Sequence, residues 1–298
     1  MIEFEPISLA HKPLFDELLT WEDSKSSGSS FGNVFLWDLY CRRSVARLGD
    51  RLGIEFLCRK GPFYAFPSGR GDLRGAVEAL RERARTQGYS PFRMNGVTAP
   101  ERRALEECFP DRFTFTECRD DFDYICTVES VATLAGKKLH GKRNFCNRFE
   151  ASYTWSFEDM TKAHFAPCLD LLDEWDREKD GGDAEENRAI RRVFENWDAL
   201  GMTGGVLFAD GAPVAFTIGE RIGADIVDIH FEKARADIPG AYPMVAREYA
   251  RRIAETQPEI RYLNREEDMG LPNIRRAKEE WYPLFLLEKF SAEWRAEP

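Results

Sequence analysis

The order of hydrophobic patterns along the chain is the feature that most constrains its fold, because it recurs in both halves. Period-2 segments typical of strands alternate with period-3.6 segments typical of helices. In the first half a helix is expected over 72–88, and in the second half a strand over 225–233 leads into a helix over 240–256. A length of 298 residues suits two domains. We therefore expect an α/β (α+β) protein whose mixed sheets are flanked by helices, with domains at 1–128 and 129–298.

The charge balance limits the partners of the chain. With 42 Lys and Arg against 52 Asp and Glu, the net charge is −10, which disfavours nonspecific binding to nucleic acid or to an anionic membrane. An anionic partner would have to meet a local basic patch. The start of the sequence lacks the layout of a secretory signal, and no apolar run reaches the roughly 18 residues of a membrane span. We expect a cytoplasmic protein without an integral membrane segment, and the sequence leaves the oligomeric state open.

The seven cysteines and four histidines do not suggest a disulfide framework or a metal centre. The cysteines are odd in number and include no Cys-x-x-Cys pair, so we expect them to be reduced and expect no metal site. The polar, serine-rich stretch 23–30 is expected to form a surface loop.

The window 136–149, at the centre of a helix expected near 129–150, contains five Lys and Arg residues and no acid. On a helical wheel Lys142 falls inside the apolar arc that Leu139, Cys146 and Phe149 form. Burying an unpaired ammonium is costly, so Lys142 either extends to solvent or meets an anion. The window is thus either a solvated charge run or a cradle for phosphate or carboxylate. The candidate binding residues are Lys138, Lys142, Arg143, Asn144 and Arg148.

The strand expected over 225–233 carries titratable groups on alternate positions. Strict alternation places Asp228, His230 and Glu232 on one face and apolar residues on the other. A histidine beside carboxylates can act as a general base, and the group can also bind the ammonium of a substrate. These three residues are therefore the candidate catalytic residues. A partly exposed strand with a polar face is the alternative.

A Pro-Gly turn then leads into the helix over 240–256. Free backbone N–H groups at a helix start favour an anion, so Gly240 and Ala241 are candidates for binding a cofactor phosphate and Tyr242 for binding substrate. An ordinary strand-to-helix connection explains the turn equally well.

The segment 264–278 joins a strand end to a helix start, where sites are often found. Lys278 lies within its apolar stripe, as Lys142 does in the earlier helix. Because of these two lysines we expect 136–148, 228–232 and 264–278 to border one cleft, although structural ion pairs would also explain the mixed charges. The candidate binding residues are Asn264, Arg265, Glu266, Asp268, Arg275 and Lys278.

Three segments in this order resemble soluble members of the phosphatidylglycerol lysyltransferase C-terminal domain family. They are Gly-Lys-Lys-Leu-His-Gly-Lys-Arg-Asn at 136–144, His-Phe-Glu-Lys-Ala at 230–234 and Asn-Arg-Glu-Glu-Asp-x-Gly-Leu-Pro at 264–272, with weaker similarity at 31–37. The resemblance implies two tandem acetyltransferase-like (GNAT-like) domains, an arrangement shared with enzymes that take an aminoacyl group from charged tRNA. It also implies that coenzyme A, if used, would meet the turn at 238–242, which lacks the usual glycine series.

We therefore expect an enzyme that moves an acyl or aminoacyl group from an activated donor to an amine or hydroxyl acceptor. The donor is either aminoacyl-tRNA or acyl-CoA, and no other cofactor or metal is expected. The alternative is a non-catalytic module on the same fold that binds a small anion or has a regulatory role. A purely structural protein is disfavoured, because two lysines in apolar stripes are poor choices for packing alone.

Overall fold

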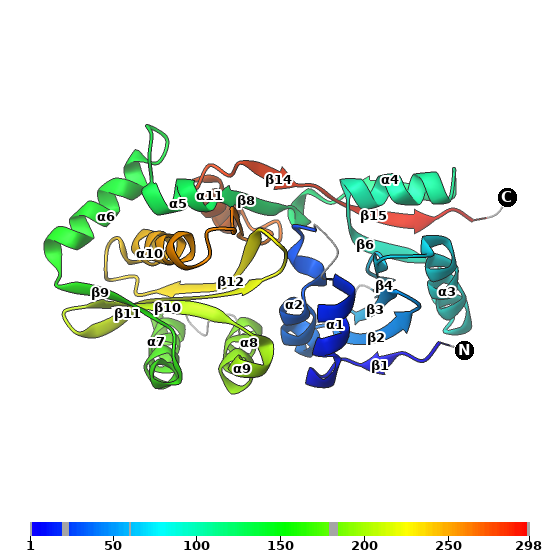
Figure 1. Cartoon of the computed structure of the whole chain (residues 1–298), viewed down its shortest axis with the longest axis horizontal. Helices are drawn as coiled ribbons and strands as arrows, with labels where there is room; N and C mark the ends of the chain where they lie inside the picture. The colour runs from blue at the N-terminus through cyan, green and yellow to red at the C-terminus, as the bar shows by residue number, and fades with distance from the viewer. Residues whose placement is uncertain (1, 20–23, 60, 179–183, 297–298) are drawn as a thin grey trace. The chain divides into compact units, whose positions relative to one another are not determined.

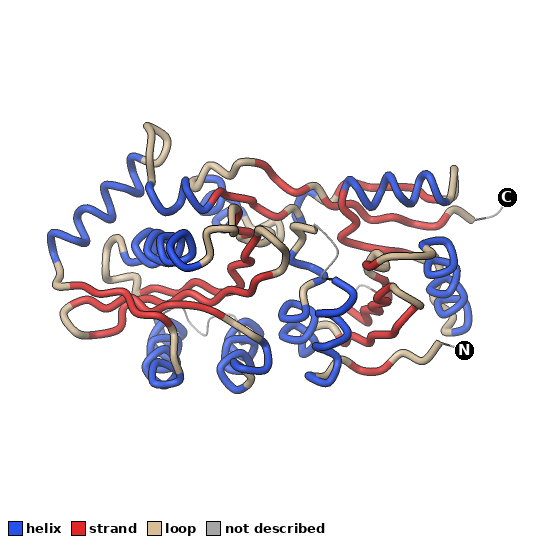
Figure 2. Tube along the Cα trace, in the orientation of Figure 1, coloured by secondary structure: helices blue, strands red, loops and turns tan. Residues whose placement is uncertain are grey.

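The computed structural model describes residues 2–19, 24–59, 61–178 and 184–296. The chain forms two compact units (Figure 1). Unit 1 comprises Met1–Asp123, Glu267–Leu271 and Leu286–Pro298, and unit 2 comprises Tyr124–Glu266 and Pro272–Phe285. Each unit is a mixed α/β layer structure with its own sheet (Figure 2).

Unit 1 is built on a sheet of strand order β1-β2-β3-β4-β6-β15-β7, with β5 beside β3. The helix α3 begins at Asp72, whose side chain accepts a hydrogen bond from the Gly75 N–H, and it buries one apolar stripe against the sheet. The α4 N-terminus has the capping box of Thr98 and Glu101 that the sequence predicts. The elements are β1 (Glu5–Pro6), α1 (Lys12–Leu19), α2 (Phe31–Leu36), β2 (Arg42–Leu48), β3 (Arg51–Cys58), β4 (Gly61–Tyr64), β5 (Ser68–Gly69), α3 (Leu73–Thr86), β6 (Arg93–Thr98), α4 (Ala99–Cys108), β7 (Phe113–Glu117) and β15 (Lys289–Trp294).

Unit 2 has a sheet of order β14-β8-β13-β12-β11-β10-β9, in which β12 and β13 are parallel. The helices α5, α6 and α10 lie on one side of the central strands, and α7, α8 and α9 lie on the other (Figure 1). The elements are β8 (Asp123–Thr127), α5 (Val128–Thr133), α6 (His140–Ser152), β9 (Trp155–Asp159), α7 (Phe165–Glu178), α8 (Ala184–Glu195), α9 (Trp197–Leu200), β10 (Thr203–Ala209), β11 (Ala212–Arg221), β12 (Ile226–Ala234), α10 (Ala241–Thr256), β13 (Tyr262–Asn264), α11 (Pro272–Glu279) and β14 (Phe285–Leu287).

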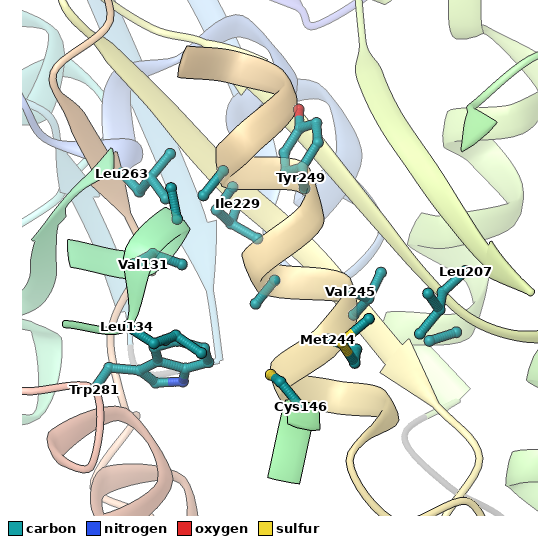
Figure 3. Packing of buried hydrophobic residues seen from close by; sticks show 14 of the residues in the cluster. Val131, Leu134, Cys146, Leu207, Ile229, Met244, Val245, Tyr249, Leu263 and Trp281 are labelled. Carbon is teal, nitrogen blue, oxygen red and sulfur yellow. The ribbon is translucent and has the colours of Figure 1, made fainter. Parts of the chain in front are cut away.

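The core of unit 2 forms around the amphipathic helix α10. Its stripe of Val245, Tyr249 and neighbouring residues packs on Ile229 of β12 and Leu263 of β13, near Trp281 (Figure 3). Apolar residues at 242, 245, 246, 249, 250 and 253 have helical spacing, so the sequence predicts this stripe. Tyr242 is the exception, because its side chain is exposed at the start of the helix.

The observed division of the chain differs from the predicted domains 1–128 and 129–298. The C-terminal strand β15 pairs with β6 and β7 and therefore belongs to unit 1. The expected helix over 129–150 is two helices, because Leu134 (φ 50°) and Gly136 (φ 81°) take left-handed conformations after α5. Such backbone ends a helix.

Two local expectations in unit 1 are wrong. Ser26, Ser27 and Ser30 are buried rather than part of a surface loop, and the Ser27 hydroxyl donates to the buried carboxylate of Asp123. Residue 23, at the start of that loop, lies outside the described residues. Cys41 and Cys58 form a disulfide, because Arg42 pairs with Leu57 across β2 and β3 and this register brings the two thiols together. Their separation of 17 residues alone could not show it.

In the described part of the chain, no helix combines the length and the apolar character needed to cross a membrane.

Candidate functional site

A cavity of about 420 Å³ opens in unit 2 where α6, the turn before α10 and the segment after α11 meet. Three of its lining side chains are cationic (Lys138, Lys142 and Arg235), and three are aromatic. The Lys138 Nζ lies 5.5 Å from the ring centroid of Tyr282. The lining residues are Lys138, Gly141, Lys142, Phe145, Arg235, Ala236, Ile238, Pro239, Gly240, Tyr242, Pro243, Glu280 and Tyr282.

Gly240 allows the start of α10 to lie against α6. Its φ of 93° is in the left-handed region, and a Cβ at this position would lie 2.6 Å from the Phe145 carbonyl oxygen. The Ala241 N–H donates to the Ile238 carbonyl at 3.2 Å, and Pro243 has no N–H. The helix start therefore offers an anion fewer N–H groups than the sequence suggests, and the predicted roles of Gly240 and Ala241 in holding a cofactor phosphate gain no support.

Lys142 lies in an aromatic and charged pocket at the inner side of the cavity. Its side chain is 18% exposed, its Nζ lies 3.8 Å from Glu280 Oε2, and it is 4.5 Å from the ring centroid of Trp281. Burial lowers the pKa of Lys142, and the charge of Arg265 lowers it further. The prediction that this lysine lies among apolar groups is confirmed.

Arg265 approaches the same indole ring from the segment after β13. Its guanidinium lies 4.6 Å from the Trp281 centroid and donates to Glu232 at 3.0 Å. The strand pairing between β12 and β13 ends at Asp228 and Asn264, whereas β12 continues to Ala234. Lys142, Arg265 and Glu232 thus meet where the two parallel strands separate. The three predicted segments therefore touch at these side chains. They do not border one cleft, however, because the described residues that line the cavity include none from 228–232 or 264–278.

His230 occupies a buried cluster of carboxylates. Its Nδ1 lies 3.0 Å from Glu266 Oε1 and 3.5 Å from Asp228 Oδ2, and its Nε2 lies 3.1 Å from Glu220 Oε2. Burial alone would lower the pKa of His230, but the charge of Asp228 and the hydrogen bonds to Glu220 and Glu266 raise it well above 6.5. Because each ring nitrogen faces a carboxylate oxygen within hydrogen-bond distance, both nitrogens donate and the side chain is an imidazolium. A fully buried imidazolium cannot accept a proton from a substrate, which does not fit the predicted general base.

A β-bulge at His230 alters the predicted faces of β12. Ile218 pairs with Phe231 and Gly219 with Ile229, so His230 is the extra residue. Beyond the bulge the alternation is reversed. Ala234 joins Val227 and Ile229 in the core, and Lys233 pairs with Glu186 at 2.6 Å. Asp228 and His230 share a cluster as predicted, but Glu232 does not belong to it.

Asn264 shapes the turn that positions Glu266. Its Oδ1 accepts a hydrogen bond from the Glu266 N–H at 2.7 Å, and Glu266 has a φ of 54°. The Glu266 side chain is 16% exposed, whereas that of His230 is fully buried. Ligand atoms of Asp228, His230 and Glu266 lie within 4.8 Å of one another and could hold a metal ion. A positively charged His230 explains equally well, without a metal ion, why these carboxylates lie together.

The other predicted binding residues have different environments. Arg143 donates to the Leu134 and Gly136 carbonyls, and Asn144 bonds to His140, so both stabilise the loop before α6 and its first turn. Arg148 is exposed, and Arg275 and Lys278 are partly buried on α11. Asp268 belongs to unit 1, where it pairs with Arg119 at 3.1 Å, so it is not part of this site.

Sequence reasoning missed several residues of the site. Phe145, Arg235, Glu280 and Tyr282 line the cavity, and Glu220 pairs with His230. Helical spacing places Trp281 in one apolar stripe with Leu271 and Ile274 but does not indicate its contacts with Lys142 and Arg265. Arg235 could have been found from the sequence, because it directly follows the polar strand. Glu220 could not, because its position beside His230 depends on the register between β11 and β12.

The two α/β units, each with its own mixed sheet flanked by helices, define the class of fold as tandem GNAT-like. The chain belongs to the family described as phosphatidylglycerol lysyltransferase, C-terminal, whose sequence profile matches residues 21–293.

Solved structures agree with this assignment. A conserved protein of unknown function from Bacteroides thetaiotaomicron is 36% identical, with a TM-score of 0.93 over 99% of this chain and 100% of that one. The C-terminal domain of a putative lysylphosphatidylglycerol synthetase from Agrobacterium fabrum is 16% identical, with a TM-score of 0.68 over 97% and 93%.

Two further structures share the fold. L-PGS from Bacillus licheniformis is 17% identical, with a TM-score of 0.56 over 98% of this chain and 89% of that one. FemX is 10% identical, with a TM-score of 0.59 over 97% and 96%. None of the curated proteins compared with the chain matches it.

Proposed function

We propose that the protein is an aminoacyl transferase and that its cavity holds the acylated end of an aminoacyl-tRNA. The observation that carries this proposal is the combination of cationic Lys138, Lys142 and Arg235 with aromatic Phe145, Tyr242 and Tyr282 around one opening. Single-stranded RNA ends are bound by cations on the phosphates and by aromatic rings stacked on unpaired bases. Because the chain has a net charge of −10, a polyanion such as tRNA would be repelled by most of its surface. We therefore expect tRNA to bind at this local cationic patch.

The reaction needs few groups from the protein. The acceptor nitrogen or oxygen bonds to the acyl carbon, the ester bond to the tRNA ribose breaks, and the acceptor proton passes to the ribose oxygen. Holding donor and acceptor together supplies a large part of such a rate, and nearby cations stabilise the charge that develops on oxygen. The cationic side chains that line the cavity are the candidates for that role.

Acyl-CoA is the competing donor. It would place its pyrophosphate at the turn before α10, where the Ala241 N–H is already bonded to Ile238. The aromatic residues around the cavity favour the RNA end instead.

Titration of charged tRNA and of acetyl-CoA at several salt concentrations tests the donor. We expect saturable tRNA binding whose affinity falls with salt, with a log–log slope of roughly 0.7 to 0.9 per phosphate contacted. Lys138→Gln should lower that slope, whereas Lys162→Gln should not, because Lys162 is paired with Asp198 and does not line the cavity. Saturable acetyl-CoA binding without salt-sensitive tRNA binding would reverse the choice of donor.

One observation favours a second function, the non-catalytic binding of a small anion. The predicted base His230 is a buried imidazolium, so a deprotonating group must come from elsewhere or from the acceptor itself. Loss of the aminoacyl group from bound tRNA, followed with phosphatidylglycerol vesicles, free amino acids or amine-bearing peptides as acceptors, separates the two functions. Transfer to one acceptor supports the enzyme, and intact aminoacyl-tRNA with all of them supports the binding module.

A further inference from the structure

The cations of the cavity lie at two depths. Lys138 is exposed and lies beside Tyr282, which is itself half exposed. Lys142 is mostly buried and lies over the indole of Trp281. Phosphates are strongly hydrated and suit the exposed cations, so the part of a donor that reaches Lys142 is its acyl or aminoacyl group.

Each of the two carboxylates near Lys142 is shared with an arginine, Glu280 with Arg276 at 3.3 Å and Glu232 with Arg265 at 3.0 Å. The carboxylate nearest to Lys142, that of Glu280, is 3.8 Å away and 52% exposed, so solvent weakens that pair. The other carboxylate close to it, Glu232, already accepts a hydrogen bond from Arg265. Lys142 and Arg265 therefore bring two cations to one indole ring.

The lining of the cavity contains more cations than carboxylates. Among the described residues that line it, Glu280 is the single carboxylate. Of the three cationic side chains, Arg235 is paired with Glu174 and Asp237, so Lys138 and Lys142 are the cations that a ligand can meet. Glu280 can face the α-ammonium of an aminoacyl ester. A lysyl or arginyl group would bring a second ammonium or guanidinium to Lys142, and like charges at close range repel.

We infer that the acyl group accepted by this site bears a carboxylate, as an aspartyl or glutamyl group does, and that Lys142 selects it. The inference rests on the proposed function. A carboxylate beside Lys142 makes a charge-assisted hydrogen bond in a poorly hydrated pocket, whereas an uncharged group leaves the ammonium without that partner.

The test uses one tRNA body that carries aspartate, alanine or lysine through a hydrolysis-resistant 3′-amide, so that all phosphate contacts are the same. We expect the wild-type chain to bind the aspartyl form about tenfold more tightly than the alanyl form, and the lysyl form most weakly. Lys142→Gln should reduce these differences to about twofold, and Lys142→Glu should reverse the order. Lys138→Gln is the matched control and should weaken all three forms by the same factor.

The outcomes separate this inference from the proposed function. Preference for the lysyl form, or an unchanged order in both Lys142 variants, overturns the inference and leaves aminoacyl-tRNA as the donor. If neither charged nor uncharged tRNA binds, the proposed function fails and the inference fails with it. Lys142→Gln changes the charge and little of the shape, so the test does not depend on Lys142→Glu folding.

Discussion

At the scale of single residues, the charged side chains of the site are of two kinds. Some are cations that can bind a ligand, and others form ion pairs that stabilise the fold. Lys142 is the clearest case of the first kind, because burial and the charge of Arg265 disfavour its ammonium, and its carboxylate partner Glu280, 3.8 Å away, is half exposed. His230 is the clearest case of the second kind, since its two ring nitrogens each meet a carboxylate. Substitution should therefore affect the two residues in opposite ways.

Replacing Lys142 by Met should weaken donor binding while changing the free energy of unfolding by less than about 1 kcal/mol. The lost cation–π contact with Trp281 costs roughly 0.5–1 kcal/mol, and relief of the burial of an ammonium offsets it. Urea unfolding and tRNA titration on the same preparation measure both quantities. A loss of more than 2 kcal/mol with unchanged affinity would identify Lys142 as a structural ion-pair partner instead.

Replacing His230 by Gln should destabilise unit 2 by about 3–5 kcal/mol, because it removes the cation that faces the buried carboxylates of Asp228 and Glu220 and the partly exposed one of Glu266. The wild-type chain should also show a pH dependence that the variant lacks. The pKa of His230 is raised on folding, so its stabilising contribution is complete below pH 6.5 and is lost as pH rises from there through the folded-state value. The slope is at most about 1.4 kcal/mol per pH unit. Urea midpoints between pH 6 and 9 measure it, and equal slopes in both proteins would contradict the assignment of an imidazolium.

At the scale of elements, the close approach of α6 and α10 forms one wall of the cavity. Gly240→Ala places a Cβ 2.6 Å from the Phe145 carbonyl oxygen and also strains a φ of 93°. Gly211→Ala is a matched control, because Gly211 has a φ of 82° and open space around it.

We expect Gly240→Ala to lower the free energy of unfolding by about 1 kcal/mol or more beyond Gly211→Ala, and to weaken donor binding as well. Thermal unfolding and tRNA titration of the two variants check this. Equal destabilisation of both would mean that α6 can move aside, and that contact with α10 does not set the wall.

The elements also show what could be predicted from the sequence. Helical periodicity correctly predicts the buried stripe of α10 and the inward position of Lys142, because both depend on neighbours within one helix. The bulge at His230 could not be predicted, since it is set by the pairing of β12 with β11. For the same reason the face of Glu232 and the partner Glu220 were missed.

At the scale of the whole molecule, the division into units depends on pairings far apart in sequence. Arg93 and Glu293, on the paired strands β6 and β15, are 200 residues apart and joined by an ion pair of 2.9 Å. Hydrophobic periodicity within one segment cannot predict that two strands so far apart in sequence pair with each other. The predicted second domain therefore included the last strand, and Asp268 was assigned to a site of the other unit.

The last strand gives a prediction about unit 1. In the strand order β15 lies between β6 and β7, and Lys289 at its start donates to the buried carboxylate of Asp123 at 2.6 Å. A chain ending at Glu288 loses β15, the strand with which both β6 and β7 pair, and it also loses the cation beside Asp123. We expect hydrogen exchange to show loss of protection throughout β6 and β7, while β10, β11 and β12 stay protected, because unit 2 has its own core.

Two variants distinguish the causes of that loss. A chain ending at Arg295 keeps β15 and should exchange like the full chain. Lys289→Met in the full chain breaks a buried ion pair while keeping the strand, so it should cost about 3–5 kcal/mol yet leave β6 and β7 protected relative to loops. If β6 and β7 exchanged slowly in the chain ending at Glu288, another segment would have to complete their hydrogen bonds. The central place of β15 in unit 1 would then be wrong.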